Sequence, residues 1–169
     1  MKKSGNQPAN KSEQYANASD FCELFRRDTE SLYQLAFVLT GNGQRAEEAL
    51  ASALEDCFKS RVFKPWARSW SRLALIERAI KSAVLDLNGS SEHLGHRSAE
   101  LDAILHLKAF DRFVYVLSVF EKYSIKDCAI LLKASKREVM ESKIRALQEV
   151  TAFIGVPSTN VESPVQLSA

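Results

Sequence analysis

A run of basic residues interleaved with aromatic rings lies near the middle of the sequence, between residues 59 and 81. Cations neutralise a phosphate backbone and flat rings stack on unpaired bases, so this combination is typical of a site for single-stranded nucleic acid. The alternative is that Trp70 belongs to the core and that the cations form a solvated helix surface. The side chains that we expect to contact a strand are Arg61, Lys64, Trp66, Arg68 and Arg72.

Two helices with explicit start signals follow one another toward the C-terminal end. Ser124 precedes Asp127 by three residues, and Ser135 precedes Glu138 by the same interval. At this spacing the hydroxyl accepts a hydrogen bond from a free backbone N–H and the carboxylate complements the helix start. The turn between the two helices, residues 133–135, is short, as in a helix-turn-helix.

Cations gather around the start of the second of these helices. Lys136 and Arg137 lie at its N-terminus, where a helix-turn-helix places its base-reading side chains. Glu138 and Glu141 reduce the positive charge, so a protein-docking module is the alternative to a DNA-binding one. The side chains that we expect to contact DNA here are Lys133, Lys136, Arg137 and Lys143.

The residues show no arrangement typical of catalysis, because there is no glycine-rich phosphate loop and no Ser-His-Asp or Cys-His set. His93 and His96 lack partnering ligands and are interpreted as solvated linker groups rather than a metal site. Three cysteines lie among apolar helical positions, which predicts buried, reduced thiols at Cys22, Cys57 and Cys128. We therefore expect no enzyme, no cofactor and no metal.

Composition indicates a folded protein, since 46% of the 169 residues are hydrophobic and only 6 are Gly and 4 are Pro. The net charge of +2 is too small to indicate a partner by itself. No apolar stretch approaches the roughly 18 residues of a membrane span, and the polar start has no signal-peptide core. We expect a cytoplasmic protein.

Helical periodicity divides the first half into three elements. Residues 1–18 are polar and are predicted to be a disordered arm. Apolar spacing predicts a helix from about residue 19 that stops at Gly41 and Asn42, and a second over about 44–60 with Phe58 inward. Pro65 suits the first turn of a third helix, whose apolar stripe extends past Val84 to Leu87. Residues 19–88 are therefore predicted to form a three-helix bundle.

Turn-forming residues without periodicity mark residues 89–100 as a flexible interdomain linker. A second domain, residues 101–155, is predicted to contain a helix over 101–121 that breaks near Lys108, a short helix over 125–132 and a longer one over 136–153. Residues 156–169 form a polar tail. The predicted fold class is thus all-α, with two small helical domains.

Both halves contain sequence motifs that resemble those of a known family. The stretch 113–147 reads FVYVLSVFEKYSIKDCAILLKASKREVMESKIRAL and resembles region 4 of sigma factors, with its Tyr-Ser cap, scaffold helix and recognition helix. The stretch 32–50 reads LYQLAFVLTGNGQRAEEAL and resembles region 2. The order and spacing of the two also match. The chain thus resembles the sigma-70 family of RNA polymerase, in particular the group IV or extracytoplasmic-function sigma factors, as a divergent member.

This resemblance implies a transcription initiation protein that binds core RNA polymerase and promoter DNA, both duplex and melted. It places polymerase contacts on the second helix, at Glu47, Glu48, Ala51, Ser52 and Glu55. An antagonist protein is a further partner that it allows. The alternative is a sigma-like interaction protein that keeps the fold without promoter recognition, because Ala51, Ser52, Met140 and Glu141 depart from the usual residues. The usual turn glycine is Lys133, which costs about 1 kcal/mol if that position requires positive φ.

Overall fold

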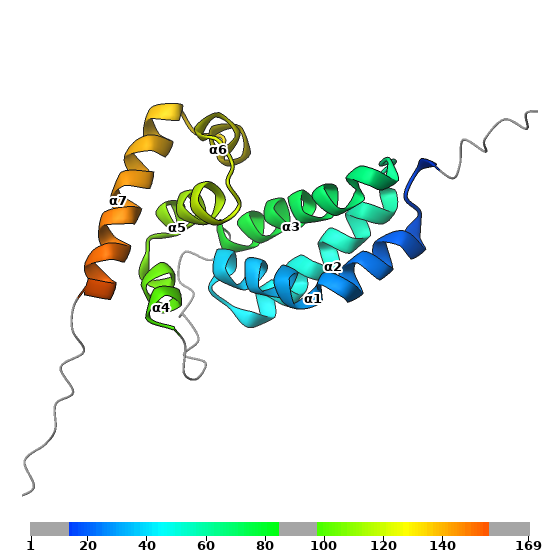
Figure 1. The fold of residues 1–169 in the computed structure, drawn as a ribbon, viewed down its shortest axis with the longest axis horizontal. Helices are drawn as coiled ribbons and strands as arrows, with labels where there is room; N and C mark the ends of the chain where they lie inside the picture. Colours follow the sequence, from blue (N-terminus) through cyan, green and yellow to red (C-terminus); the bar gives the residue numbers. More distant parts are fainter. Residues whose placement is uncertain (1–13, 85–97, 156–169) are drawn as a thin grey trace, which may run out of the picture.

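The computed structural model of the chain describes residues 14–84 and 98–155 (Figure 1). These residues are all-α, as predicted, with one isolated bridge between Tyr15 and Phe63. The first half contains α1 (Ala18–Thr40), α2 (Gly43–Lys59), a 3-10 turn η2 (Lys64–Trp66) and α3 (Ala67–Val84). The second half contains α4 (Ala99–His106), α5 (Ala109–Tyr115), a π-helical turn η3 (Val116–Phe120), α6 (Ile125–Leu132) and α7 (Lys136–Gly155).

The first three helices form the predicted bundle. Asn17 caps α1, because its side chain accepts from the Asp20 N–H at 3.0 Å and the Asp20 carboxylate accepts from the Asn17 N–H at 2.9 Å. The helix ends at Gly41, whose φ of 72° is left-handed and favours glycine. Asn42 then caps α2 by accepting from the Arg45 N–H at 3.0 Å. This two-residue connection sends α2 back along α1.

The second half follows the predicted pattern of breaks and caps. Lys108 has an extended ψ of 146° and separates α4 from α5. Ser124 and Ser135 accept hydrogen bonds from the Asp127 and Glu138 N–H groups, each at 3.2 Å, and so begin α6 and α7. The chain between α6 and α7 is the short turn of residues 133–135.

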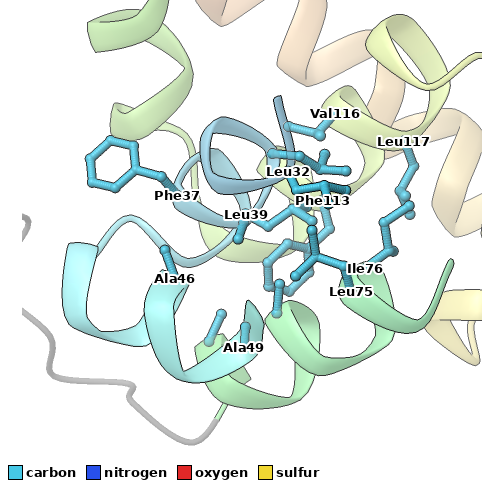
Figure 2. Packing of buried hydrophobic residues seen from close by; sticks show 14 of the residues in the cluster. Leu32, Phe37, Leu39, Ala46, Ala49, Leu75, Ile76, Phe113, Val116 and Leu117 are labelled. Carbon is cyan, nitrogen blue, oxygen red and sulfur yellow. The ribbon is translucent and has the colours of Figure 1, made fainter. Parts of the chain in front are cut away.

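The two halves are packed against each other. Leu32 of α1 and Ile76 of α3 lie close to Phe113, Val116 and Leu117 of the second half (Figure 2). All five side chains are buried in one hydrophobic cluster. Contacts of α1 and α3 with α5 are accompanied by an ion pair between Arg72 of α3 and Glu121, the residue that follows η3.

Two predicted boundaries need correction. The disordered arm was predicted to reach residue 18, but Ala16 is buried, its N–H donates to the Val62 carbonyl at 2.8 Å, and α1 already begins at Ala18. The linker was predicted to reach residue 100, but Ser98 caps α4, which begins at Ala99. The rest of the arm and linker, both linker histidines, Leu87 and the polar tail lie outside the described residues.

Several side chains differ in burial from the prediction. Cys22 is exposed, because it lies about 100° around the helix from the buried Phe21. Phe58 and Val84, which were expected to face inward, are also exposed. Cys57 and Cys128 are buried as predicted, and this burial raises the pKa of both thiols.

Lys133 occupies a strained backbone position between α6 and α7. Its φ of 51° is left-handed, a conformation that costs a residue with a side chain about 1 kcal/mol or more. We therefore expect Lys133→Gly to raise the free energy of unfolding by about 1 kcal/mol in urea denaturation followed by circular dichroism. Lys126→Gly is the matched control, because Lys126 is exposed inside α6 and glycine there should lower stability by about 1 kcal/mol. A Lys133→Gly protein no more stable than the parent would contradict this prediction.

Candidate nucleic-acid interface

Three aromatic rings meet on the surface where the chain passes from α2 to α3. The Tyr15 and Phe63 rings are stacked with centroids 4.5 Å apart, and Trp66 meets Phe63 edge-on at 5.6 Å. Pro65 fixes the backbone of η2 between them. Trp66 is 65% exposed, so its ring is available to a ligand rather than built into the core.

Cations surround these rings. The Arg61 guanidinium lies 4.2 Å from the centroid of the Tyr15 ring in a cation–π contact. The Lys64 ammonium is 3.3 Å from the Asp20 carboxylate, and Arg68 Nε is 2.8 Å from that of Asp28. We call the group the aromatic-basic cluster; its members are Tyr15, Arg61, Phe63, Lys64, Trp66 and Arg68.

The acidic partners of this cluster are groups on α1. The pKa of Asp20 is lowered by the backbone hydrogen bond from Asn17 and then by Lys64. The pKa of Asp28 is lowered by the side-chain hydrogen bond from Arg27, with a further contribution from Arg68. Exposed ion pairs of this kind contribute only about 0–1 kcal/mol, so Lys64 and Arg68 can exchange a carboxylate for a phosphate at little cost.

Tyr15 is a member of the cluster that sequence reasoning missed. It was placed in the predicted arm because the residues around it are polar. The Tyr15–Phe63 pairing joins residues 48 positions apart in the chain, so no local pattern indicates it. Tyr15 lies two residues before the cap Asn17, one position earlier than a hydrophobic staple, so no local signal in the sequence indicates its role.

Trp70, one turn after Trp66, is 40% exposed and therefore is not the core residue that the alternative interpretation required. It lies in α3 beyond the aromatic-basic cluster. The chain thus presents two exposed indole rings in sequence, Trp66 at the end of η2 and Trp70 in the first turn of α3.

Arg72, which was predicted to contact the strand together with Arg68, lies one turn further along α3 and has a partner in the second half of the chain. Its guanidinium forms a two-pronged ion pair with Glu121, with Nη2 2.6 Å from Oε1. The hydrogen bond to Glu121 raises the pKa of Arg72. Arg72 therefore links α3 to the second half of the chain.

Further cations of the same run stabilise the bundle. Arg78 of α3 forms a two-pronged pair with Asp56 of α2, with Nη2 2.6 Å from Oδ1. This hydrogen bond raises the pKa of Arg78 and lowers that of Asp56. Of the basic run, Arg61, Lys64 and Arg68 thus lie near the rings, whereas Arg72 and Arg78 form two-pronged pairs with Glu121 and Asp56.

The predicted polymerase-contacting residues lie together along the outer side of α2. Ser52 is half-buried, and the Glu48 side chain accepts from Gln44 at 3.0 Å. Ala51 lines a shallow surface pocket between α1 and α2 together with Leu50 and Leu54. The exposed members of the set are Glu47, Glu48, Ala51 and Glu55.

The second predicted DNA site is a looser arrangement at the start of α7. Lys133, Lys136 and Arg137 are exposed, and Lys143 is half-buried. Arg137 lies 3.7 Å from Glu141, which offsets part of its charge. The nearby Glu138 carboxylate caps α7, and its hydrogen bonds with Ser135 lower its pKa.

Arg145 is directed toward the inner side of α7. It lies 2.8 Å from the buried carboxylate of Asp111 on α5, which also accepts a hydrogen bond from Ser142 at 2.5 Å. The pair raises the pKa of Arg145. This residue therefore links α7 to α5, although its side chain is still half exposed.

The described residues contain no group of three or more His, Cys, Asp or Glu side chains placed to hold a metal ion. None of the described helices is long and apolar enough to cross a bilayer.

Comparison with known proteins identifies the fold. No family model matches the chain, and no curated protein matches its sequence. A structure of the sigma factor RpoE in complex with the anti-sigma factor NepR from Bartonella quintana is similar, with a TM-score of 0.57 and 16% identity over 82% of this chain and 98% of that one. At this identity the likeness concerns the architecture alone. The chain therefore has a sigma-factor-like, all-α fold.

Proposed function

We propose that this protein is a sigma-factor-like transcription initiation protein that acts in the cytoplasm, binds core RNA polymerase and contacts promoter DNA. The observation that carries the proposal is the exposed aromatic-basic cluster on a sigma-factor-like fold. Neither feature is sufficient alone, since helical folds host many functions. Together they put rings and cations on one surface of the bundle, as strand binding requires.

In this proposal the cluster holds a melted strand. The Trp66 ring stacks on an unpaired base, and stacking of this kind contributes about 1–3 kcal/mol for each base. Arg61 and Arg68 neutralise adjacent phosphates, and Arg68 does so by leaving its weak pair with Asp28. The Phe63 ring contacts both Tyr15 and Trp66, and the Tyr15 ring contacts the Arg61 guanidinium, so these contacts keep Trp66 and Arg61 in position.

In the second half, α6 and α7 would act as a helix-turn-helix on duplex DNA. Support comes from the short turn between them and from three exposed cations at Lys133, Lys136 and Arg137. Because so few cations are present, we expect duplex DNA to bind weakly, through about three to five phosphate contacts and with a salt-dependent affinity.

A second candidate function is a sigma-like interaction protein that no longer recognises a promoter. The observation in its favour is the surface of α7, where Met140 and Ile144 are exposed in place of polar, base-reading side chains. The similar sigma factor was solved with a protein antagonist, and a comparable partner is part of this proposal.

Binding to core RNA polymerase tests the first function directly. We expect the protein to co-elute with bacterial core enzyme, and the double variant Ala51→Gln with Ser52→Glu to bind about fivefold more tightly, because one new hydrogen bond contributes about 1 kcal/mol. The matched control is Ala152→Gln with Thr151→Glu, two exposed positions on α7, which should leave the affinity unchanged. Affinity is measured by fluorescence anisotropy of labelled protein. A folded protein that fails to bind core enzyme at micromolar concentrations would favour the interaction protein.

A further inference from the structure

A row of apolar side chains runs along the outer face of α7. Met140, Ile144 and Leu147 are 47%, 51% and 40% exposed and follow one another at helical spacing. Ile154 continues the row two turns later at 48%. We call these four side chains the outer α7 stripe; it extends over about 21 Å at 1.5 Å per residue.

The stripe is additional to the core face of α7. That face is fully accounted for by side chains packed toward α4, α5 and α6, which are Val139, Ser142, Ala146 and Val150. Single exposed apolar residues are ordinary on protein surfaces, whereas a row aligned over four turns, interrupted at Thr151, is typical of a helix with two contact faces. No described part of the chain buries this second face.

Charge distinguishes the two edges of the stripe. At about 100° per residue, Lys136 and Lys143 lie about 40° and 60° to the same side of Met140, and neither has an ion-pair partner among the described residues. The opposite edge carries Arg137 and Glu141, which pair with each other at 3.7 Å. The complementary surface is therefore apolar with carboxylates along one edge.

A second copy of this chain does not supply that surface. In an antiparallel α7 pair the lysine edge of one copy would face the lysine edge of the other. In a parallel pair it would face the edge that carries both Arg137 and Glu141, so attraction to the carboxylate is offset by repulsion from the guanidinium. Neither arrangement offers Lys136 and Lys143 a net negative edge, which disfavours self-association.

We propose that the outer α7 stripe is the docking surface for an amphipathic helix of a partner protein, with an apolar stripe edged by Asp or Glu. The apolar row would bury against Met140, Ile144 and Leu147, and the acidic edge would pair with Lys136 and Lys143. The same lysines are the candidate phosphate contacts of the second half. A docked helix and duplex DNA would therefore exclude each other, while the docking itself does not depend on polymerase or DNA binding.

The test uses the full chain and three stapled helical peptides of about 20 residues, long enough to span the stripe. All three carry the same leucine stripe, edged by Glu, by Gln or by Lys, and binding is followed by fluorescence anisotropy. We expect the Glu peptide to bind most tightly and the Lys peptide at least tenfold more weakly. Lys136→Glu with Lys143→Glu should reverse this order. Three peptides of equal affinity, or none that binds, would overturn the proposal.

A second set of variants tests the stripe itself. The double variant Ile144→Ser with Leu147→Ser should bind the Glu peptide at least tenfold more weakly than the parent. Phe58→Ser, which replaces a similarly exposed apolar side chain on α2, should leave the affinity unchanged. Thermal melts establish that each variant is folded. Sedimentation of the parent as a dimer that Ile144→Ser dissociates would show a second copy as the occupant. Loss of duplex DNA affinity in the stripe variant, with peptide affinity intact, would assign the stripe to DNA; either result would overturn the proposal.

Discussion

Replacing Arg72 with alanine is expected to lower the free energy of unfolding by about 2 kcal/mol while leaving the affinity for single-stranded DNA unchanged. The Arg72 guanidinium forms a two-pronged ion pair with Glu121 and also lies 3.3 Å from the Ser31 hydroxyl. Because Arg72 is on α3 and Glu121 directly follows η3, this pair joins the two halves of the chain. Its loss leaves a nearly buried carboxylate without a cation.

The magnitude follows from the burial of the two partners. Removing one member of a fully buried pair costs about 3–5 kcal/mol, and an exposed pair contributes about 0–1 kcal/mol. Glu121 retains only 9% side-chain exposure, but Arg72 retains 35%, so solvent screens the pair and the expected cost lies between these ranges. Urea denaturation followed by circular dichroism measures it.

A double-mutant cycle separates the ion pair from the other contacts of Arg72. Glu121→Gln alone should also lower the free energy of unfolding. Arg72→Ala combined with Glu121→Gln should lower it by less than the sum of the two single effects. Arg68→Ala is the matched control, because the Arg68 side chain is 71% exposed. This substitution should lower the free energy of unfolding by less than about 1 kcal/mol and should weaken DNA binding. Additive effects in the cycle, or loss of strand affinity in Arg72→Ala, would contradict this account.

The local signals in the sequence predicted the helices well. Capping residues act on backbone groups within three positions, so Ser124, Ser135 and Gly41 fix the ends of helices regardless of the remainder of the chain. The break near Lys108 is equally local, because two consecutive extended residues, Leu107 and Lys108, interrupt the helical hydrogen bonds. Fold class and element order could therefore be predicted from residues close together in the chain.

The errors arise where contacts join distant residues. Nothing near Arg72 in the sequence indicates a partner 49 positions away, so its ion pair with Glu121 was not predicted. The end of the arm was misassigned for the same reason, since Tyr15 and Ala16 are ordered by residues 62 and 63. The exposure of Cys22 was predictable in principle, because helical geometry turns it away from Phe21.

The candidate site depends both on residues that are neighbours in the sequence and on contacts between distant residues. The sequence alone placed rings beside cations, because Phe63, Lys64 and Trp66 are near neighbours in the chain. The packing of the helices, by contrast, determines which rings face solvent and which cations already have an ion-pair partner. Arg61, Lys64, Trp66 and Arg68 lie around the same rings as Tyr15, and we therefore propose these five side chains as the strand-binding set.

Replacing Trp66 with alanine is expected to weaken binding of single-stranded DNA by about 1–3 kcal/mol, a factor of about 5 to 150 in Kd. The ring is 65% exposed and meets only the edge of Phe63, so its removal opens no cavity in the core. The unfolding free energy should therefore change by no more than about 0.5 kcal/mol. Anisotropy titrations with a labelled single strand of about 12 nucleotides, at two salt concentrations, measure the affinity.

Three further changes separate stacking from folding. Trp66→Phe retains a ring and should recover part of the affinity, whereas Phe58→Ala, which removes a ring of similar exposure outside the cluster, should have no effect. Phe63→Ala removes the ring that Tyr15 and Trp66 both contact, so it should lower strand affinity and also loosen the chain before α1. A stable Trp66→Ala protein with undiminished affinity would eliminate base stacking. Because Arg61 and Arg68 would remain in that protein, any residual binding with a steep salt dependence would then be attributable to phosphate contacts alone.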